Sequence, residues 1–146
     1  MTTVTRGLDG IAVGDVLPEL RIRLTRTLIV AGALATRDFE DVHHDPGRAM
    51  ERGTPDTYMS INNTNNFVGR YVTDWTGPGA VMTKLSTRLL VPNFPGDTMT
   101  MTGEVVAVEA DTITVSVRGT NSNGAHVVSQ MTLRLPATTG ERGASR

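Results

Sequence analysis

The sequence contains no cysteine, which excludes disulfide bonds, thiolate metal sites and a cysteine nucleophile. Aromatic residues make up only 4% of the 146 residues, so the core has to be built from Val, Leu, Ile, Met and Ala. No apolar run approaches the roughly 18 residues of a membrane span, and the first residues lack the apolar run of a signal peptide. We therefore expect a cytoplasmic protein that does not contact a membrane.

Charge of one sign is not concentrated anywhere in the chain. Fourteen Lys and Arg stand against 15 Asp and Glu, and the basic residues are scattered, so nucleic acid is not an expected partner. The length and the 38% hydrophobic content, without a break in composition, indicate a single domain over residues 1–136. Residues 1–10 are predicted to form a loose leader and residues 137–146 a disordered tail.

Hydrophobic periodicity predicts an early strand, one long helix and a series of strands. Apolar residues alternate over 20–24, and the apolar segment 28–35 is predicted to be a second strand that runs into a helical turn. From Pro55 the spacing becomes helical for about four to five turns, with Asp56 and Thr57 available as caps. Alternation after the Gly-Pro-Gly segment then predicts further strands over 81–91, 99–105, 113–117 and up to 135, with a hairpin at 121–124.

This order of elements is that of a hotdog fold, an α+β fold in which an antiparallel sheet wraps around one central helix. A single sheet of this kind leaves an edge and a face open, and two units commonly pair into one continuous sheet. The minimum expected assembly is therefore a dimer, either homomeric or heteromeric.

A dense polar cluster lies between residues 36 and 46, just before the predicted helix. It contains the segment Asp38-Phe39-Glu40-Asp41-Val42-His43. This segment resembles the motif of MaoC-like, (R)-specific enoyl-CoA hydratases, in which Asp, a variable residue, Asn, Pro, an aliphatic residue and His follow in that order. The segments 77–80 and 92–97 also look like the family's strand entry and its Pro-x-x-x-Gly-Asp turn, so the resemblance spans roughly residues 12–136.

Two segments, 35–45 and 70–75, look more closely like the small MaoC-like subunit of bacterial steroid side-chain hydratases. In that family the small subunit pairs with a larger MaoC-like subunit. The resemblance implies hydration of a steroid enoyl-CoA with a shortened side chain, late in sterol (cholesterol) side-chain degradation. It also implies a heterotetramer with the larger subunit, or otherwise a homodimer, and no cofactor, because CoA is part of the substrate.

The resemblance assigns roles to three residues. Asp38 would polarise or deprotonate a water molecule, and His43 would orient that water and help to transfer its proton. Aligned from Pro92 back through Gly69, Ser60 stands where the family has Gly, and its backbone N–H would contact the thioester oxygen. The Cβ of Ser then limits how closely the substrate approaches.

The motif departs from the family at Glu40 and Asp41, which replace Asn and Pro, so three acids crowd one loop. Either Arg37 and His44 offset this charge or the loop has a different shape. Two other functions stay open: a non-catalytic hotdog subunit that shapes the acyl pocket of a partner, and an acyl-CoA thioesterase that uses a carboxylate-activated water.

No metal site is expected, because His43 and His44 are adjacent and point apart, while His126 lies in a strand far along the sequence. The Asn-rich half of the helix, 62–66, either lines a polar channel or faces a partner or solvent. The aromatic stripe of Phe67, Tyr71 and Trp75 is interpreted as core or dimer interface. Arg88 and Arg118 are interpreted as solvated positions on the sheet.

Overall fold

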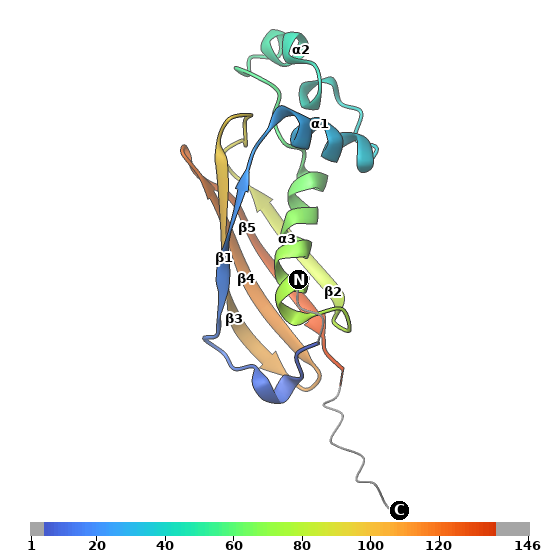
Figure 1. The fold of residues 1–146 in the computed structure, drawn as a ribbon, viewed down its shortest axis with the longest axis vertical. Coiled ribbons are helices and arrows are strands. Elements are labelled where there is room, and N and C mark those ends of the chain that lie inside the picture. Colours follow the sequence, from blue (N-terminus) through green and yellow to red (C-terminus); the bar gives the residue numbers. More distant parts are fainter. Residues whose placement is uncertain (1–4, 137–146) are drawn as a thin grey trace, which may run out of the picture.

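The structure, a computed structural model, describes residues 5–136. A five-stranded antiparallel sheet curves around one long helix, α3 (Ile61–Thr76), as Figure 1 shows. The spatial order is β1-β3-β4-β5-β2, so the edges are β1 (Val16–Arg23) and β2 (Val81–Leu89). The three inner strands are β3 (Thr98–Glu109), β4 (Thr112–Asn121) and β5 (Gly124–Arg134). The predicted α+β architecture, with its sheet wrapped around a central helix, is confirmed.

The core lies between the sheet and α3 and is made by the alternation of the inner strands. Val115 pairs with Val105 on one side and Met131 on the other, and all three side chains are fully buried. Each buried aliphatic side chain of this kind contributes roughly 1.5–3 kcal/mol. The opposite face of the same strands carries Thr, Ser and charged residues. This difference between the two faces produces the alternation of polar and apolar residues that predicts the strands.

Helix α3 begins later than predicted. Its N-cap is Ser60, whose hydroxyl accepts a hydrogen bond from the N–H of Asn63 at 3.2 Å, and it ends at Gly77 with a φ of 92°. Asp56, a predicted cap, instead binds the guanidinium of Arg26 through both oxygens, at 2.6 and 2.8 Å. This pair lowers the pKa of Asp56, and it makes the carboxylate unavailable to a helix.

The predicted strand over 28–35 is wrong, because these residues form helix α1 (Arg26–Ala35). Thr25 caps the helix by accepting from the N–H of Leu28 at 3.1 Å. An unbroken apolar segment has no period that separates a buried strand from a buried helix. Gly32 allows α1 to lie close against α3, because a Cβ at this position would overlap the side-chain amide of Asn63.

Beyond α1 the chain forms two short helices, η2 (Asp41–His43) and α2 (Pro46–Glu51), above the start of α3 (Figure 1). Asp45 caps α2 by accepting from the N–H of Arg48 at 3.1 Å. This small helical layer covers one end of the central helix and carries the polar cluster of the sequence.

The described part of the predicted leader is not loose. It contains a short helix, η1 (Leu8–Gly10), and Arg6 donates to the carbonyl of Trp75 at 2.8 Å while its guanidinium lies 4.7 Å above the Trp75 ring. Residues 1–4 and the predicted tail, 137–146, lie outside the described residues. Within residues 5–136 no helix combines the length and the apolar character needed to cross a membrane.

Candidate active site

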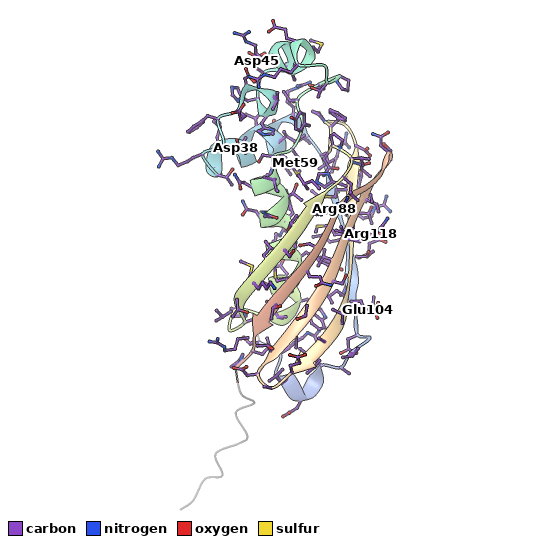
Figure 2. All side chains as sticks on the ribbon, turned by 180° about the vertical axis from the view of Figure 1, so that it is seen from behind. Asp38, Asp45, Met59, Arg88, Glu104 and Arg118 are labelled. Atoms are coloured by element: carbon purple, nitrogen blue, oxygen red, sulfur yellow. The ribbon has the colours of Figure 1, made fainter. Side chains whose placement is uncertain are left out.

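Asp38 lies where α1 ends, beside the start of α3 and near Met59 (Figure 2). The chain turns sharply at Arg37, whose φ of 57° is unusual for a residue other than glycine. The N–H of Asp38 then donates to the carbonyl of Ala33 at 2.9 Å. This turn brings the carboxylate to within 3.5 Å of the amide of Asn62, on the first turn of α3.

His43 is held in one orientation by its own backbone surroundings. Its Nδ1 lies 2.7 Å from the carbonyl oxygen of Tyr58, and the two rings meet edge to face at 5.1 Å. A carbonyl oxygen only accepts hydrogen bonds, so Nδ1 carries the hydrogen. Nε2 is therefore the free nitrogen, and it faces Oδ2 of Asp38 at 3.7 Å.

The gap between Asp38 and His43 fits one water molecule better than a direct bond. A distance of 3.7 Å exceeds that of a normal hydrogen bond, and both facing atoms are acceptors when His43 is neutral. A water beside both atoms has two hydrogens, and it can donate one to each acceptor. Its oxygen is then electron-rich and directed away from the pair, which is the arrangement that general-base addition of water requires.

This pair opens into a pocket of about 290 Å³. Most of its lining is apolar, and the polar groups are few and convergent, as is typical of a ligand site. The lining residues are Asp38, His43, Tyr58, Met59, Ile61, Leu89, Leu90, Val91, Pro92 and His126. Ile61 and Leu90 are 45% and 47% exposed, so the mouth of the pocket is apolar as well.

The charge of the crowded loop is offset by a residue that the sequence did not single out. Arg52, directly after α2, lies 3.1 Å from Asp41 and 3.6 Å from Glu40. Of the two alternatives from the sequence, the one in which Arg37 and His44 offset the charge is wrong, since neither forms an ion pair with another described residue. The guanidinium of Arg52 thus pairs with both acidic residues between Asp38 and His43.

Ser60 lies at the N-terminus of α3, between the pocket residues Met59 and Ile61, but does not itself line the pocket. Its hydroxyl is used as the helix cap, and its carbonyl accepts from the N–H of Thr64 at 3.0 Å. Its backbone N–H donates to no other group within residues 5–136. An uncommitted N–H at a helix N-terminus can stabilise a negatively charged oxygen, but Ser60 is only 1% exposed, and its predicted role stays a prediction.

His126 was interpreted as remote, yet the structure places it in the wall of the same pocket. Antiparallel pairing of β5 with β2 brings it beside Val91, whose carbonyl oxygen lies 2.7 Å from its Nδ1. Burial lowers the pKa of His126, and the hydrogen bond to Val91 only partly opposes this effect. A search for local motifs cannot detect which strands pair, so it missed His126. The one signal in the sequence was a histidine on the buried face of a predicted strand.

The remaining candidates fall outside the site. Arg88 and Arg118 are exposed and lie along the sheet in Figure 2, away from Asp38. Tyr71 is buried and the two other aromatic residues of its stripe pack partly buried against the core, as the core interpretation predicts, while Tyr71 and Trp75 also line a separate cavity of about 240 Å³. The Asn-rich half of α3 is divided, because Asn63 is buried whereas Asn66 is exposed. Among residues 5–136 no group of three or more His, Asp or Glu could hold a metal ion.

No family model matches the sequence. A curated protein of Mycobacterium tuberculosis, the beta subunit of 3-oxo-4,17-pregnadiene-20-carboxyl-CoA hydratase, is 47% identical over 123 residues, which cover 84% of this chain and 95% of that protein. A chain in the crystal structure of the ChsH1-ChsH2 complex from the same species superposes with a TM-score of 0.84 at 46% identity. That match covers 86% of this chain and 98% of the other.

More distant structures share the fold. The (R)-hydratase from A. caviae superposes with a TM-score of 0.76 at 24% identity, covering 86% of this chain and 98% of that chain. The R-hydratase PhaJ1 from Pseudomonas aeruginosa gives a TM-score of 0.81 at 17% identity, covering 90% and 86%. With the relative at 47% identity over most of both chains, this protein belongs to the MaoC-like hydratases of the hotdog fold, in the family of the M. tuberculosis beta subunit.

Proposed function

We propose that this chain is the subunit of a heteromeric enoyl-CoA hydratase that carries the acid-base pair, and that it adds water to a steroid side-chain enoyl-CoA. The observation that carries the chemistry is the 3.7 Å gap between Oδ2 of Asp38 and Nε2 of His43 at the end of an apolar pocket. The substrate class follows the name of the relative at 47% identity. A single domain over 1–136 and a cytoplasmic location stay predictions.

In the proposed reaction the water oxygen attacks the β carbon of the conjugated thioester. One hydrogen of the water passes to the Asp38–His43 pair, and the electron pair of the double bond moves into the thioester carbonyl to give an enolate. The enolate then collapses and takes the same proton at its α carbon, so one water is added and no proton is gained or lost. Acid-base assistance of this kind contributes roughly 10²- to 10⁴-fold in rate.

The enolate places negative charge on the thioester oxygen, which needs a hydrogen-bond donor. We assign this contact to the backbone N–H of Ser60, at the start of α3. The N-terminus of a helix favours negative charge, and the loss of one donor of this kind typically lowers kcat by roughly 10²- to 10³-fold. The start of α3 therefore presents the donor, and the loop after α1, whose Asp38 carboxylate lies 3.5 Å from the Asn62 amide, presents the base.

A second MaoC-like subunit is the proposed partner, by analogy with the ChsH1-ChsH2 complex. The unpaired edge strand β2 offers backbone groups for such an association, and its first residues, Val81 and Met82, are 56% and 50% exposed. Apolar side chains on an open sheet edge are unfavourable in an isolated subunit. A partner along this edge would also cover Leu90 at the mouth of the pocket.

The test is a spectrophotometric hydration assay on a steroid enoyl-CoA, using this chain purified together with a larger MaoC-like subunit. Loss of the conjugated thioester absorbance with the wild-type complex, and its abolition by Asp38→Asn in an intact complex, are the expected results. Full activity of the Asp38→Asn complex would make this chain a supporting subunit. Release of free CoA from a saturated acyl-CoA would instead identify a thioesterase.

A further inference from the structure

His126 uses both ring nitrogens to connect three elements around the pocket. The residue belongs to β5 and is only 1% exposed. Its Nδ1 lies 2.7 Å from the carbonyl oxygen of Val91, in the pocket wall after β2, and its Nε2 lies 2.9 Å from Oγ1 of Thr64, on α3. Both nitrogens are thus committed to protein groups, which directs the contribution of His126 to the geometry of the site.

The directions of these hydrogen bonds follow from the groups involved. The Val91 carbonyl only accepts, so Nδ1 of His126 carries the hydrogen and Nε2 of the neutral ring is an acceptor. Burial keeps the ring neutral by lowering its pKa. The Thr64 hydroxyl must therefore donate to Nε2, although the carbonyl oxygen of Ser60 also lies within reach at 3.2 Å.

Thr64 transmits this contact to the start of the helix. Its backbone N–H donates to the Ser60 carbonyl at 3.0 Å, so Thr64 and Ser60 close the first turn of α3. Met59, which precedes the helix cap, is also linked directly to the segment after β2, because its N–H donates to the carbonyl of Asn93 at 3.0 Å. The first turn is thus fixed by one backbone bond and by the chain from Val91 through His126 to Thr64.

We propose that His126 is a positioning residue, which through Thr64 fixes the first turn of α3 against the pocket wall and so sets where the Ser60 N–H meets the thioester oxygen. The inference rests on the proposed hydratase function. It assigns the second histidine of the pocket to the thioester end of the substrate, whereas His43 serves the water. Displacement of a reacting group by about 1 Å can cost roughly 100-fold in rate.

The test is the substitution Thr64→Val in the complex with the larger subunit, followed by steady-state kinetics on the steroid enoyl-CoA. Val keeps the shape of Thr but removes the donor to His126. We expect kcat to fall by roughly 10- to 100-fold while KM changes less than about threefold, since the donor acts on the charge that develops in the transition state. Thr64→Ser retains the hydroxyl and should restore most of the wild-type kcat.

The matched control is Thr114→Val, which removes the hydrogen bond between two half-buried hydroxyl groups, Thr114 and Thr132 at 3.1 Å, on the outer face of the sheet. It should leave kcat unchanged. If Thr64→Val does not assemble, His126→Gln replaces it, because the Gln side chain can still accept from Thr64 while losing the bond to Val91. The same division between kcat and KM is expected for it.

The outcomes separate this inference from the proposed function. A wild-type complex that hydrates the substrate, together with a Thr64→Val complex of equal kcat, overturns the positioning role and leaves the hydratase intact. An equal fall of kcat in Thr64→Val and Thr114→Val would also overturn it, since the effect would then be general. A wild-type complex without hydration activity overturns both.

Discussion

The pocket has a histidine in each of two walls, and the two differ at only one nitrogen. In the helical layer, His43 has its Nδ1 2.7 Å from the carbonyl of Tyr58, and in the sheet His126 has its Nδ1 2.7 Å from the carbonyl of Val91. Nε2 of His43 faces a carboxylate across a 3.7 Å gap, whereas Nε2 of His126 is occupied by a hydroxyl at 2.9 Å. The same hydrogen bond from Nδ1 to a backbone carbonyl therefore orients a proton-transfer group in one wall and a positioning residue in the other.

The largest effect should come from removing the histidine whose nitrogen is free. His43→Gln in the complex is expected to lower kcat by roughly 10²- to 10⁴-fold, because the Gln amide can accept a hydrogen bond from the water but cannot take up its proton, while KM changes little. The measurement is the hydration assay at saturating substrate. His44→Gln is the matched control, since His44 is an exposed neighbour, and it should retain full activity. A loss below about threefold in His43→Gln would remove His43 from the chemistry.

A second prediction concerns a substitution in α1 that disturbs the helical wall of the pocket, which carries Asp38 and His43, and leaves the sheet wall with His126 unchanged. In Gly32→Ala the new Cβ would overlap the buried side-chain amide of Asn63, so either this side chain is displaced or α1 shifts away from α3. We expect a loss of roughly 1–3 kcal/mol in the free energy of unfolding, together with a reduced kcat. Chemical denaturation of the complex measures the first and the hydration assay the second.

The control for this substitution is Gly69→Ala, on the same helix α3 as Asn63. A Cβ at Gly69 meets no atom within 4 Å, so the variant should be stabilised by roughly 0.5–1 kcal/mol, as expected when Ala replaces Gly inside a helix. Equal stability changes in the two variants would contradict the close approach of α1 to α3.

The two walls also differ in how far the sequence could predict them. The strands were readable because Ile113, Val115 and Val117 alternate with hydroxyl residues, and the Asp38–His43 pair was readable because both residues belong to one short motif. His126 could not be placed, since its position depends on β5 pairing with β2 from about 35 residues earlier in the chain. Local patterns thus predicted the reacting pair but not its opposite wall.

Two helix predictions also failed. The start of α3 was assigned to Asp56 and Thr57, which have suitable side chains, but Arg26 binds Asp56 from 30 residues away and leaves Ser60 as the cap. The apolar segment of α1 carried no period that separates a buried helix from a buried strand. A contact between distant residues thus decided the first case, and the lack of a period the second.

The smallest predicted effect concerns how acid affects the two walls. His126 is neutral when folded because burial lowers its pKa, whereas in the unfolded chain its pKa is near the ordinary value of about 6.5. Below about pH 6.5 the unfolded chain binds a proton that the folded protein does not, so this residue lowers the stability as the pH falls from there towards the folded pKa. Above that window His126 contributes no slope.

Comparison of wild type with His126→Gln isolates this contribution, since Asp38 and His43, which line the same pocket, are present in both proteins. Thermal unfolding of the two complexes between pH 7.5 and pH 5 should show a steeper fall of Tm on acidification for the wild type. The variant starts from a lower Tm because Val91 loses its donor. Parallel curves would mean that His126 binds a proton equally well in the folded and unfolded states. A ring that takes up a proton in the folded protein cannot be the neutral residue that accepts from Thr64, and the proposed difference between His126 and His43 would then be wrong.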